Sequence, residues 1–231
     1  MFETVTIEDQ PMELSTQISS SSKRVAKDLL NLRAVQFNVK EPFTWVSGIK
    51  SPVYCDNRVV ISDVEIRKRL IGFFLELIQQ HFQDVQIIAG VATGGIPMGV
   101  LIADRMNLPF VYVRQVAKEH GLKRQVEGSY TFGNNVVVIE DHISTGSSSS
   151  KAIQGLRNEG LSVLGLVSIM TYGFKAAVDL FNQEKVIHYS LCNLDTMLDV
   201  ALDNKRISNQ EKESILSFRN SPEHWAGSIK E

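Results

Sequence analysis

The chain has 231 residues, of which 43% are hydrophobic and 22% are charged, and its formal net charge is −2. This is the composition of an ordinary globular protein, and without an overall basic charge we expect no nucleic-acid partner. The two cysteines, Cys55 and Cys192, have neither zinc-site nor disulfide-framework spacing, so we expect free thiols. Because the acidic start lacks a secretory pattern and no apolar run approaches about 18 residues, we expect a cytoplasmic protein without a membrane span.

The start of the chain is predicted to hold an extension, a helix and several short strands. Residues 1–22 form an N-terminal extension to which no chemistry is assigned. Residues 22–37 carry apolar side chains at helical spacing, which predicts an amphipathic helix. Residues 41–58, "EPFTWVSGIKSPVYCDNR", are rich in Pro, Gly and Ser, which favours short strands and tight turns.

From residue 62 onward the chain alternates between helices and short strands. Ser62 is predicted to begin a helix that runs to about His81, because Ser62 and Glu65 have capping-box spacing. Apolar runs then lie at 85–89, 109–113, 136–139, 162–170 and 186–190, and helical segments at about 97–105, from 147 onward, at 174–182 and within 204–220. This alternation predicts an α/β protein with a mainly parallel sheet covered by helices on both faces.

One long polar interval, Gln115 to Asn135, interrupts this alternation between two strands. Loops of this length inside a compact domain are usually functional or disordered. Its basic and imidazole side chains favour a loop that closes over an anion, and a solvated basic hairpin remains the alternative. These side chains are Arg114, Lys118, His120, Lys123 and Arg124.

The stretch "VVVIEDHISTGSSSS", residues 136–150, combines two acids with a hydroxyl-rich turn. Ligands of open α/β sheets bind at the carboxyl ends of the strands, where Glu140 and Asp141 are expected. The following turn opens a helix, whose free N–H groups and dipole attract anions. A plain strand end whose acids favour the helix dipole is the alternative. A second turn of small residues, 92–95, follows another strand and adds modest support.

The carboxylates of Glu140 and Asp141, together with the anion-binding turn that follows them, suit a ligand with phosphates at its ends and a sugar diol between them. N–H donors suit the phosphates and carboxylates suit the hydroxyls, and phosphoribosyl pyrophosphate has this layout. If such a ligand arrives with Mg²⁺, the nearby carboxylates also balance the charge of the metal. Neither a GxxxxGK[ST] loop nor a GxGxxG turn after a strand occurs in the chain, which weakens the common nucleotide-binding alternatives.

"VVVIEDHISTGSS" resembles the phosphoribosyl-pyrophosphate motif of the type I phosphoribosyltransferases. "FTWVSGIKSP", "AGVATGGIP", "YVRQVAKEHG" and "SIMTYGF" resemble, in order and spacing, the orotate branch of that family, in its bacterial form with a TYG segment. The likeness extends over residues 23–226. It implies a type I phosphoribosyltransferase fold in a single domain, 23–231, with a small N-terminal hood at about 41–60 and a long flexible lid loop at about 115–135.

The activity implied by the resemblance is transfer of a phosphoribosyl group from phosphoribosyl pyrophosphate to orotate, giving orotidine 5-monophosphate and pyrophosphate in de novo pyrimidine (UMP) biosynthesis. Asp141, Lys118 and His120 would be catalytic. Residues implied to bind phosphoribosyl pyrophosphate are Arg114, Lys118, His120, Glu140, Asp141, His142, Ile143, Ser144, Thr145, Gly146, Ser147 and Ser148. Residues implied to bind orotate are Ser144, Tyr54 and Lys50, with simple solvent exposure left open for Lys50.

The resemblance also implies Mg²⁺ as cofactor, held mainly by the substrate, and a homodimer whose lid residues serve the partner's site. Two positions depart from the family pattern: Gln115 replaces a frequent basic residue, and His142 replaces an apolar one. His142 has two open interpretations, packing or tuning of the acid pair near neutral pH. Two alternative functions are a phosphoribosyl-pyrophosphate sensor without catalysis and a transferase for another nucleobase. We expect the decarboxylation that follows in the pathway to belong to another protein.

Overall fold

The computed structural model describes residues 20–45, 48–115 and 125–225. The strands of its central sheet are β5 (Ile87–Val91), β6 (Phe110–Val113), β7 (Val126–Glu127), β8 (Asn135–Ile143), β9 (Ser162–Thr171) and β10 (Ile187–Asn193). Their order is β10-β9-β8-β5-β6-β7, and only the β6–β7 pair is antiparallel. The predicted α/β architecture with a mainly parallel sheet is confirmed.

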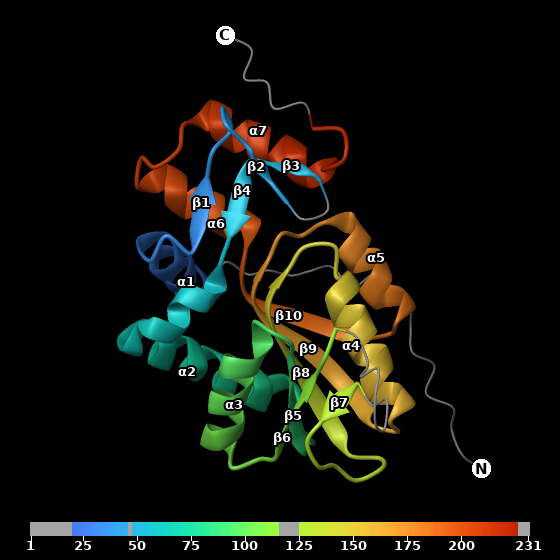
Figure 1. Cartoon of the computed structure of the whole chain (residues 1–231). Coiled ribbons are helices and arrows are strands. Elements are labelled where there is room, and N and C mark those ends of the chain that lie inside the picture. Colours follow the sequence, from blue (N-terminus) through green and yellow to red (C-terminus); the bar gives the residue numbers. More distant parts are fainter. Residues whose placement is uncertain (1–19, 46–47, 116–124, 226–231) are drawn as a thin grey trace, which may run out of the picture.

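Helices cover both faces of this sheet (Figure 1). They are α1 (Ser20–Asn31), α2 (Val64–His81), α3 (Gly95–Met106), α4 (Ser147–Asn158), α5 (Lys175–Gln183), α6 (Leu194–Asp203) and α7 (Asn209–Asn220). In β8, Val137 and Ile139 enter the core beneath α2 and α3, whereas Val136 and Val138 enter the core beneath α4 and α5. This is the two-residue alternation of a strand buried on both sides.

Two small antiparallel strand pairs lie beside α6 and α7 at one end of the molecule (Figure 1). They are β1 (Val35–Phe37) with β4 (Val53–Cys55), and β2 (Phe43–Thr44) with β3 (Lys50–Ser51). Trp45 follows β2, and its ring centroid lies 5.3 Å from that of Tyr172 and 5.8 Å from that of Phe218. The residue after β9 and helix α7 therefore pack against the predicted hood segment.

The first predicted helix is too long at its C-terminus. Helix α1 ends at Asn31, because Arg33 adopts a left-handed conformation with φ of 55° and the N–H of Ala34 donates to the carbonyl of Leu29 over 2.9 Å. The next residues form β1 instead of a further helical turn. Tertiary pairing with β4 has overridden the local periodicity.

The predicted cap of the second helix is wrong by one residue. Ser62 closes the short 3-10 helix η1 (Asn57–Ser62), and Asp63 is the N-cap of α2, with its carboxylate accepting from the N–H of Ile66 over 2.9 Å. A carboxylate at this position also favours the helix dipole. A reciprocal capping box does occur at the last helix, between Ser208 and Glu211.

The predicted lid loop is shorter than 115–135, because part of that interval belongs to the sheet. Val126 and Glu127 form β7 and pair with Val113 and Tyr112 of β6. Residues 116–124 of the interval lie outside the described residues. Within the described ranges, none of the helices has the length and apolar character needed to cross a bilayer.

Replacing Phe218 by alanine should destabilise the protein by about 3–5 kcal/mol, because this fully buried ring joins α7 to the aromatic cluster beneath Trp45. Urea denaturation would measure the change in free energy of unfolding. Phe132→Ala is the matched control, since Phe132 is 86% exposed, and it should change stability by less than about 0.5 kcal/mol. Equal effects of the two substitutions would show that α7 does not hold this end of the fold together.

Candidate active site

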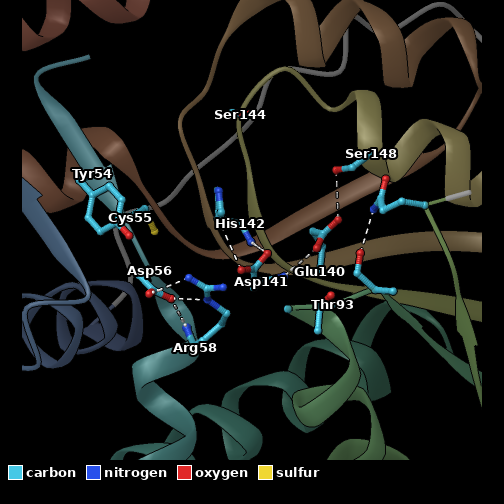
Figure 2. A pocket seen from close by; sticks show the side chains of 13 residues that line it. Tyr54, Cys55, Asp56, Arg58, Thr93, Glu140, Asp141, His142, Ser144 and Ser148 are labelled. Carbon is cyan, nitrogen blue, oxygen red and sulfur yellow. Dashed lines mark hydrogen bonds and ion pairs between the residues drawn. The ribbon is translucent and has the colours of Figure 1, made fainter. Parts of the chain in front are cut away.

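A cavity of about 430 Å³ lies at the carboxyl end of the central strands (Figure 2). Four segments line it: the end of β4 with the turn after it, the turn after β5, the end of β6, and the end of β8 with the start of α4. The lining residues are Tyr54, Cys55, Asp56, Arg58, Ala92, Thr93, Gly94, Gln115, Glu140, Asp141, His142, Ser144 and Ser148. This is the edge of an open α/β sheet at which ligands bind.

The register of β8 brings the two predicted acids into this cavity. Strand β8 pairs with β5 as far as Ile139, and beyond that residue it pairs only with β9. Glu140 and Asp141 are therefore part of a strand that extends past its neighbour. The side left open by β5 is filled by the turn at Gly94 and Gly95.

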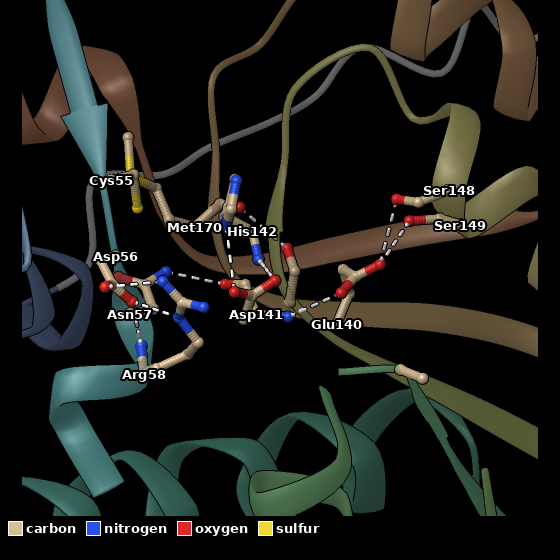
Figure 3. Close-up of polar contacts among 12 residues, drawn as sticks. Cys55, Asp56, Asn57, Arg58, Glu140, Asp141, His142, Ser148, Ser149 and Met170 are labelled. Atoms are coloured by element: carbon tan, nitrogen blue, oxygen red, sulfur yellow. Dashed lines mark hydrogen bonds and ion pairs between the residues drawn. The ribbon is translucent and has the colours of Figure 1, made fainter. Parts of the chain in front are cut away.

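Glu140 is buried and directed toward the start of α4 (Figure 3). Its carboxylate accepts from the hydroxyls of Ser149 over 3.2 Å and Ser148 over 3.4 Å, and from the N–H of Asp141 over 3.2 Å. Burial, together with the neighbouring charge of Asp141, raises the pKa of Glu140 well above its ordinary value. Glu140 therefore gives up its charge more readily than Asp141 does.

Asp141 keeps its charge because its surroundings favour the ionised form. Burial raises the pKa of Asp141, but its contacts with His142 and Glu140 outweigh burial and lower that pKa below its ordinary value. The N–H of His142 donates to Asp141 Oδ1 over 2.8 Å. Asn57 donates from Nδ2 to the main-chain carbonyl of Asp141 over 2.8 Å, which ties the turn after β4 to β8 (Figure 3).

His142 takes part in both interactions that the sequence left open. Its ring packs edge-on against Tyr172 with centroids 6.2 Å apart, as an apolar residue would pack. Its Nδ1 also lies 3.2 Å from Asp141 Oδ2, within ion-pair distance but without the alignment of a hydrogen bond. Burial lowers the pKa of His142, yet the Asp141 carboxylate outweighs it and the pKa is raised above the ordinary value.

In the turn after β5, two glycines face β8 and leave space for the side chain of Asp141. A Cβ at Gly94 would overlap the Asp141 carboxylate, and a Cβ at Gly95 would overlap the carbonyl of Ile139. Gln115, at the end of β6, donates from Nε2 to the carbonyl of Ala92 over 2.9 Å. This turn is thereby held between β6 and β8, and it forms one wall of the cavity.

The turn from Ser144 to Ser148 presents the N-terminus of α4 beside the acids. Gly146 is the N-cap, with φ of 77°, and it has no side chain to cap the first N–H groups of the helix. A side chain there would also press on Phe181. The first-turn N–H groups and the hydroxyl of Ser144 form a site suited to a phosphate, whereas the hydroxyl of Ser148 donates to Glu140.

The opposite wall of the cavity comes from the hood segment and includes two residues that the sequence analysis did not single out (Figure 2). Tyr54 lies on this wall with its ring centroid 5.4 Å from that of Phe43. Asp56 and Arg58 form an ion pair, in which Arg58 donates from Nε to Oδ1 over 2.6 Å and from Nη2 to Oδ2 over 2.9 Å. Both residues belong to the segment 41–58 and follow β4. Their opposite charges two residues apart were the feature of the sequence that could have indicated an ion pair.

The structure brings together some predicted residues and not others. Thr145, Gly146 and Ser147 belong to the turn but do not line the cavity, and the side chain of Ile143 is buried in the core beneath α4 and α5. Lys50 also lies away from the cavity and donates to Thr44 over 2.6 Å. Arg114 Nη1 lies 3.4 Å from Glu127 Oε1. Lys118 and His120 lie outside the described residues.

Comparison with known proteins supports a single family. Residues 61–193 match the model of the phosphoribosyl transferase domain. Over 198 residues the chain is 44% identical to the orotate phosphoribosyltransferase of Staphylococcus saprophyticus, covering 86% of this chain and 98% of the relative. Over 200 residues it is 45% identical to that of Bacteroides thetaiotaomicron, covering 87% and 94%. The solved orotate phosphoribosyltransferase of Aeropyrum pernix is 34% identical, with a TM-score of 0.68 over 76% of this chain and 96% of that one.

Replacing His142 by phenylalanine should change how stability depends on pH. A raised pKa in the folded state means that the stabilisation from protonated His142 is fully present below its unfolded pKa of about 6.5 and is lost as pH rises through the higher folded value. The stability difference between the native protein and His142→Phe should therefore shrink from roughly pH 6 to pH 8. Urea denaturation at several pH values would measure it. A difference that does not vary with pH would leave His142 with a packing role only.

Proposed function

Since the chain belongs to the phosphoribosyltransferase family, we propose specific roles for the residues of its cavity. Its activity is that of an orotate phosphoribosyltransferase, which transfers the phosphoribosyl group to orotate and releases pyrophosphate in pyrimidine biosynthesis. The identities across most of the chain favour this activity over a sensor without catalysis or a transferase for another base. The role assignments rest on one observation: an ionised Asp141 and the start of α4, which has no side-chain cap, lie at the same cavity.

Asp141 is the residue that we assign to the reacting sugar. In this transfer a ring nitrogen of orotate attacks the anomeric carbon while pyrophosphate leaves, and positive charge develops on the ribose as in other glycosyl transfers. An ionised, immobilised carboxylate stabilises such a charge and accepts hydrogen bonds from the ribose hydroxyls. Asn57, His142 and Gly94 hold Asp141 in position for this role.

The two ends of the donor substrate are assigned to two different turns. The 5-phosphate is placed at the start of α4, with donors from the turn that includes Ser144, Thr145, Gly146, Ser147 and Ser148. Ile143 contributes only through its main chain, since its side chain is buried. The diphosphate is placed at the turn after β5, near Arg114 and Gln115 at the end of β6. Lys118 and His120 are assigned to the same diphosphate from the family resemblance.

Orotate is assigned to the space between Tyr54 and Ser144. Both residues line the cavity, Tyr54 on the wall formed by β4 and Ser144 in the turn before α4. A flat pyrimidine ring stacks favourably on an aromatic face. Lys50 is not assigned a role, because it lies on the hood away from the cavity.

Mg²⁺ is the proposed cofactor, and the donors of the cavity fit it. This ion prefers oxygen ligands and commonly shares substrate phosphates with one or two carboxylates, which here would be Asp141 and Glu140. When bound with the diphosphate, Mg²⁺ neutralises charge on the leaving group. The protein side chains would mainly balance the charge of the ion, and the substrate would supply most of its ligands.

The proposed assembly is a homodimer in the cytoplasm. Resemblance of the segment 112–121 to the orotate branch implies that Lys118 and His120 act in the partner's site. Cys55 and Cys192 are free thiols in the structure, which suits a reducing compartment.

Mixing two inactive variants, Lys118→Ala and Asp141→Asn, should restore part of the activity. In a mixed dimer one of the two sites would receive Lys118 from one chain and Asp141 from the other, so up to about one quarter of native activity per chain is expected if the chains exchange at random. Loss of orotate absorbance with phosphoribosyl pyrophosphate and Mg²⁺ would measure turnover. Verified mixed dimers without activity would show that each lid serves its own chain.

Replacing Gly94 by alanine should reduce turnover by at least about 10-fold while leaving the fold intact, because the added methyl group would displace the Asp141 carboxylate. Gly94 has an ordinary helical conformation, so backbone strain does not contribute. Gly72→Ala in α2 is the matched control, since nothing lies within 4 Å of its added Cβ, and its turnover should stay native. Native turnover in both variants would remove the close contact at Asp141 from the mechanism.

A further inference from the structure

Orotate carries a carboxylate, and the cavity assigned to it is rich in acids. Asp56, Glu140 and Asp141 all line the cavity. A ligand carboxylate brought near these groups is repelled unless a cation lies beside it. The donor substrate does not remove this difficulty, because its own phosphates are negative.

Arg58 is the one side chain with a permanent positive charge among the described residues that line the cavity. His142 is the other candidate there, but its ring is engaged by Asp141 and Tyr172. Gln115 is neutral and bonded to Ala92. Arg114 lies beside Glu127 and outside the lining.

The guanidinium of Arg58 is held in place without using all its donors. Asp56 accepts from Nε and Nη2 of Arg58, and it also accepts from the N–H of Arg58 over 3.2 Å as the cap of η1. A guanidinium carries five N–H donors, so those of Nη1 and the second hydrogen of Nη2 stay available to a ligand. The side chain is 61% exposed and turns toward the cavity on the same wall as Tyr54 (Figure 2).

We propose that Arg58 binds the carboxylate of orotate and thereby sets the preference of this enzyme for orotate over pyrimidines without a carboxylate. The inference rests on the proposed placement of the orotate ring against Tyr54. Tyr54 and Arg58 line the same cavity on the same wall, so one ligand can place its ring against Tyr54 and its carboxylate against Arg58. Asp56 is the positioning residue, since it orients the guanidinium before the ligand arrives.

Binding of the two nucleotides orotidine 5-monophosphate and UMP separates this role from every other contact, because they differ only in the carboxylate. Isothermal titration should show that the native enzyme prefers orotidine 5-monophosphate. Arg58→Gln should weaken its binding by roughly 10- to 100-fold, as expected for loss of a charge-assisted hydrogen bond, and should change UMP binding by less than about 3-fold. Lys68→Gln, which removes an exposed charge on α2, is the matched control and should behave as native.

Two further variants keep the test decisive. Arg58→Lys retains the charge but not the fork of donors, and it should keep only part of the preference. Asp56→Asn should weaken orotidine 5-monophosphate binding by a smaller factor, because the guanidinium loses its anchor. If Arg58→Gln does not fold, unchanged preferences in both of these variants overturn the proposal. A folded Arg58→Gln with native preference, or with equal losses for both nucleotides, also overturns it.

The native enzyme distinguishes this inference from the function on which it rests. Native turnover of orotate together with an unchanged preference in Arg58→Gln overturns the role of Arg58 alone. A native enzyme that binds UMP as tightly as orotidine 5-monophosphate overturns the orotate pocket itself, and with it the proposal for Arg58.

Discussion

The site depends on one electrostatic constraint: two adjacent carboxyl groups lie on a single strand that is largely removed from water. Burial and mutual repulsion disfavour two charges, so the pair divides into a readily protonated Glu140 and an ionised Asp141. The surroundings follow this division. Serine hydroxyls contact Glu140, whereas a histidine, a main-chain N–H and a side-chain-free turn surround Asp141.

This division explains why an anion seat and two acids lie together. Only Asp141 of the two acids keeps its full charge in the cavity, and our proposal assigns it to the sugar instead of the phosphates. The phosphate seat is formed by the start of α4, whose N-cap is a glycine without a competing side chain. Glu140 lies between the two and bonds the hydroxyls that open the helix.

Local sequence patterns predicted the sheet and the site residues on β8, because each strand and the acid-containing stretch is a continuous segment of the chain. Apolar runs that alternate with helices predicted a mainly parallel sheet. The acids after Ile139 were expected at the carboxyl ends of its strands, where the structure has them. Boundaries failed where a long-range contact decides: periodicity continues past Asn31, but pairing of β1 with β4 ends the helix. At Ser62 two adjacent capping residues competed, and Asp63 is the one whose carboxylate meets the helix.

The hood wall was the least predictable part of the site. Asn57 meets Asp141 across 84 positions of sequence, and nothing in the local pattern of either segment indicates that contact. The spacing of Asp56 and Arg58 is compatible with an ion pair, but their position in the cavity depends on β4 lying across it from α4. Lys50 was chosen from the same segment by resemblance; on β3 it is exposed, donates to Thr44 and does not line the cavity, so its role in binding stays a prediction.

In the proposed assignment, the base and the phosphates are bound by different segments of the chain. Tyr54 lies on β4 of the small strand pairs and Arg58 lies in η1, whereas the phosphate site is formed by the start of α4 after β8 of the central sheet. Substitutions at Tyr54 and Arg58 can therefore change which base is accepted, whereas Asn57 on the same wall also holds Asp141 and through it the activated sugar. When the part of the site that holds the sugar and phosphates stays the same and the wall that contacts the base varies, one fold can serve several nucleobases.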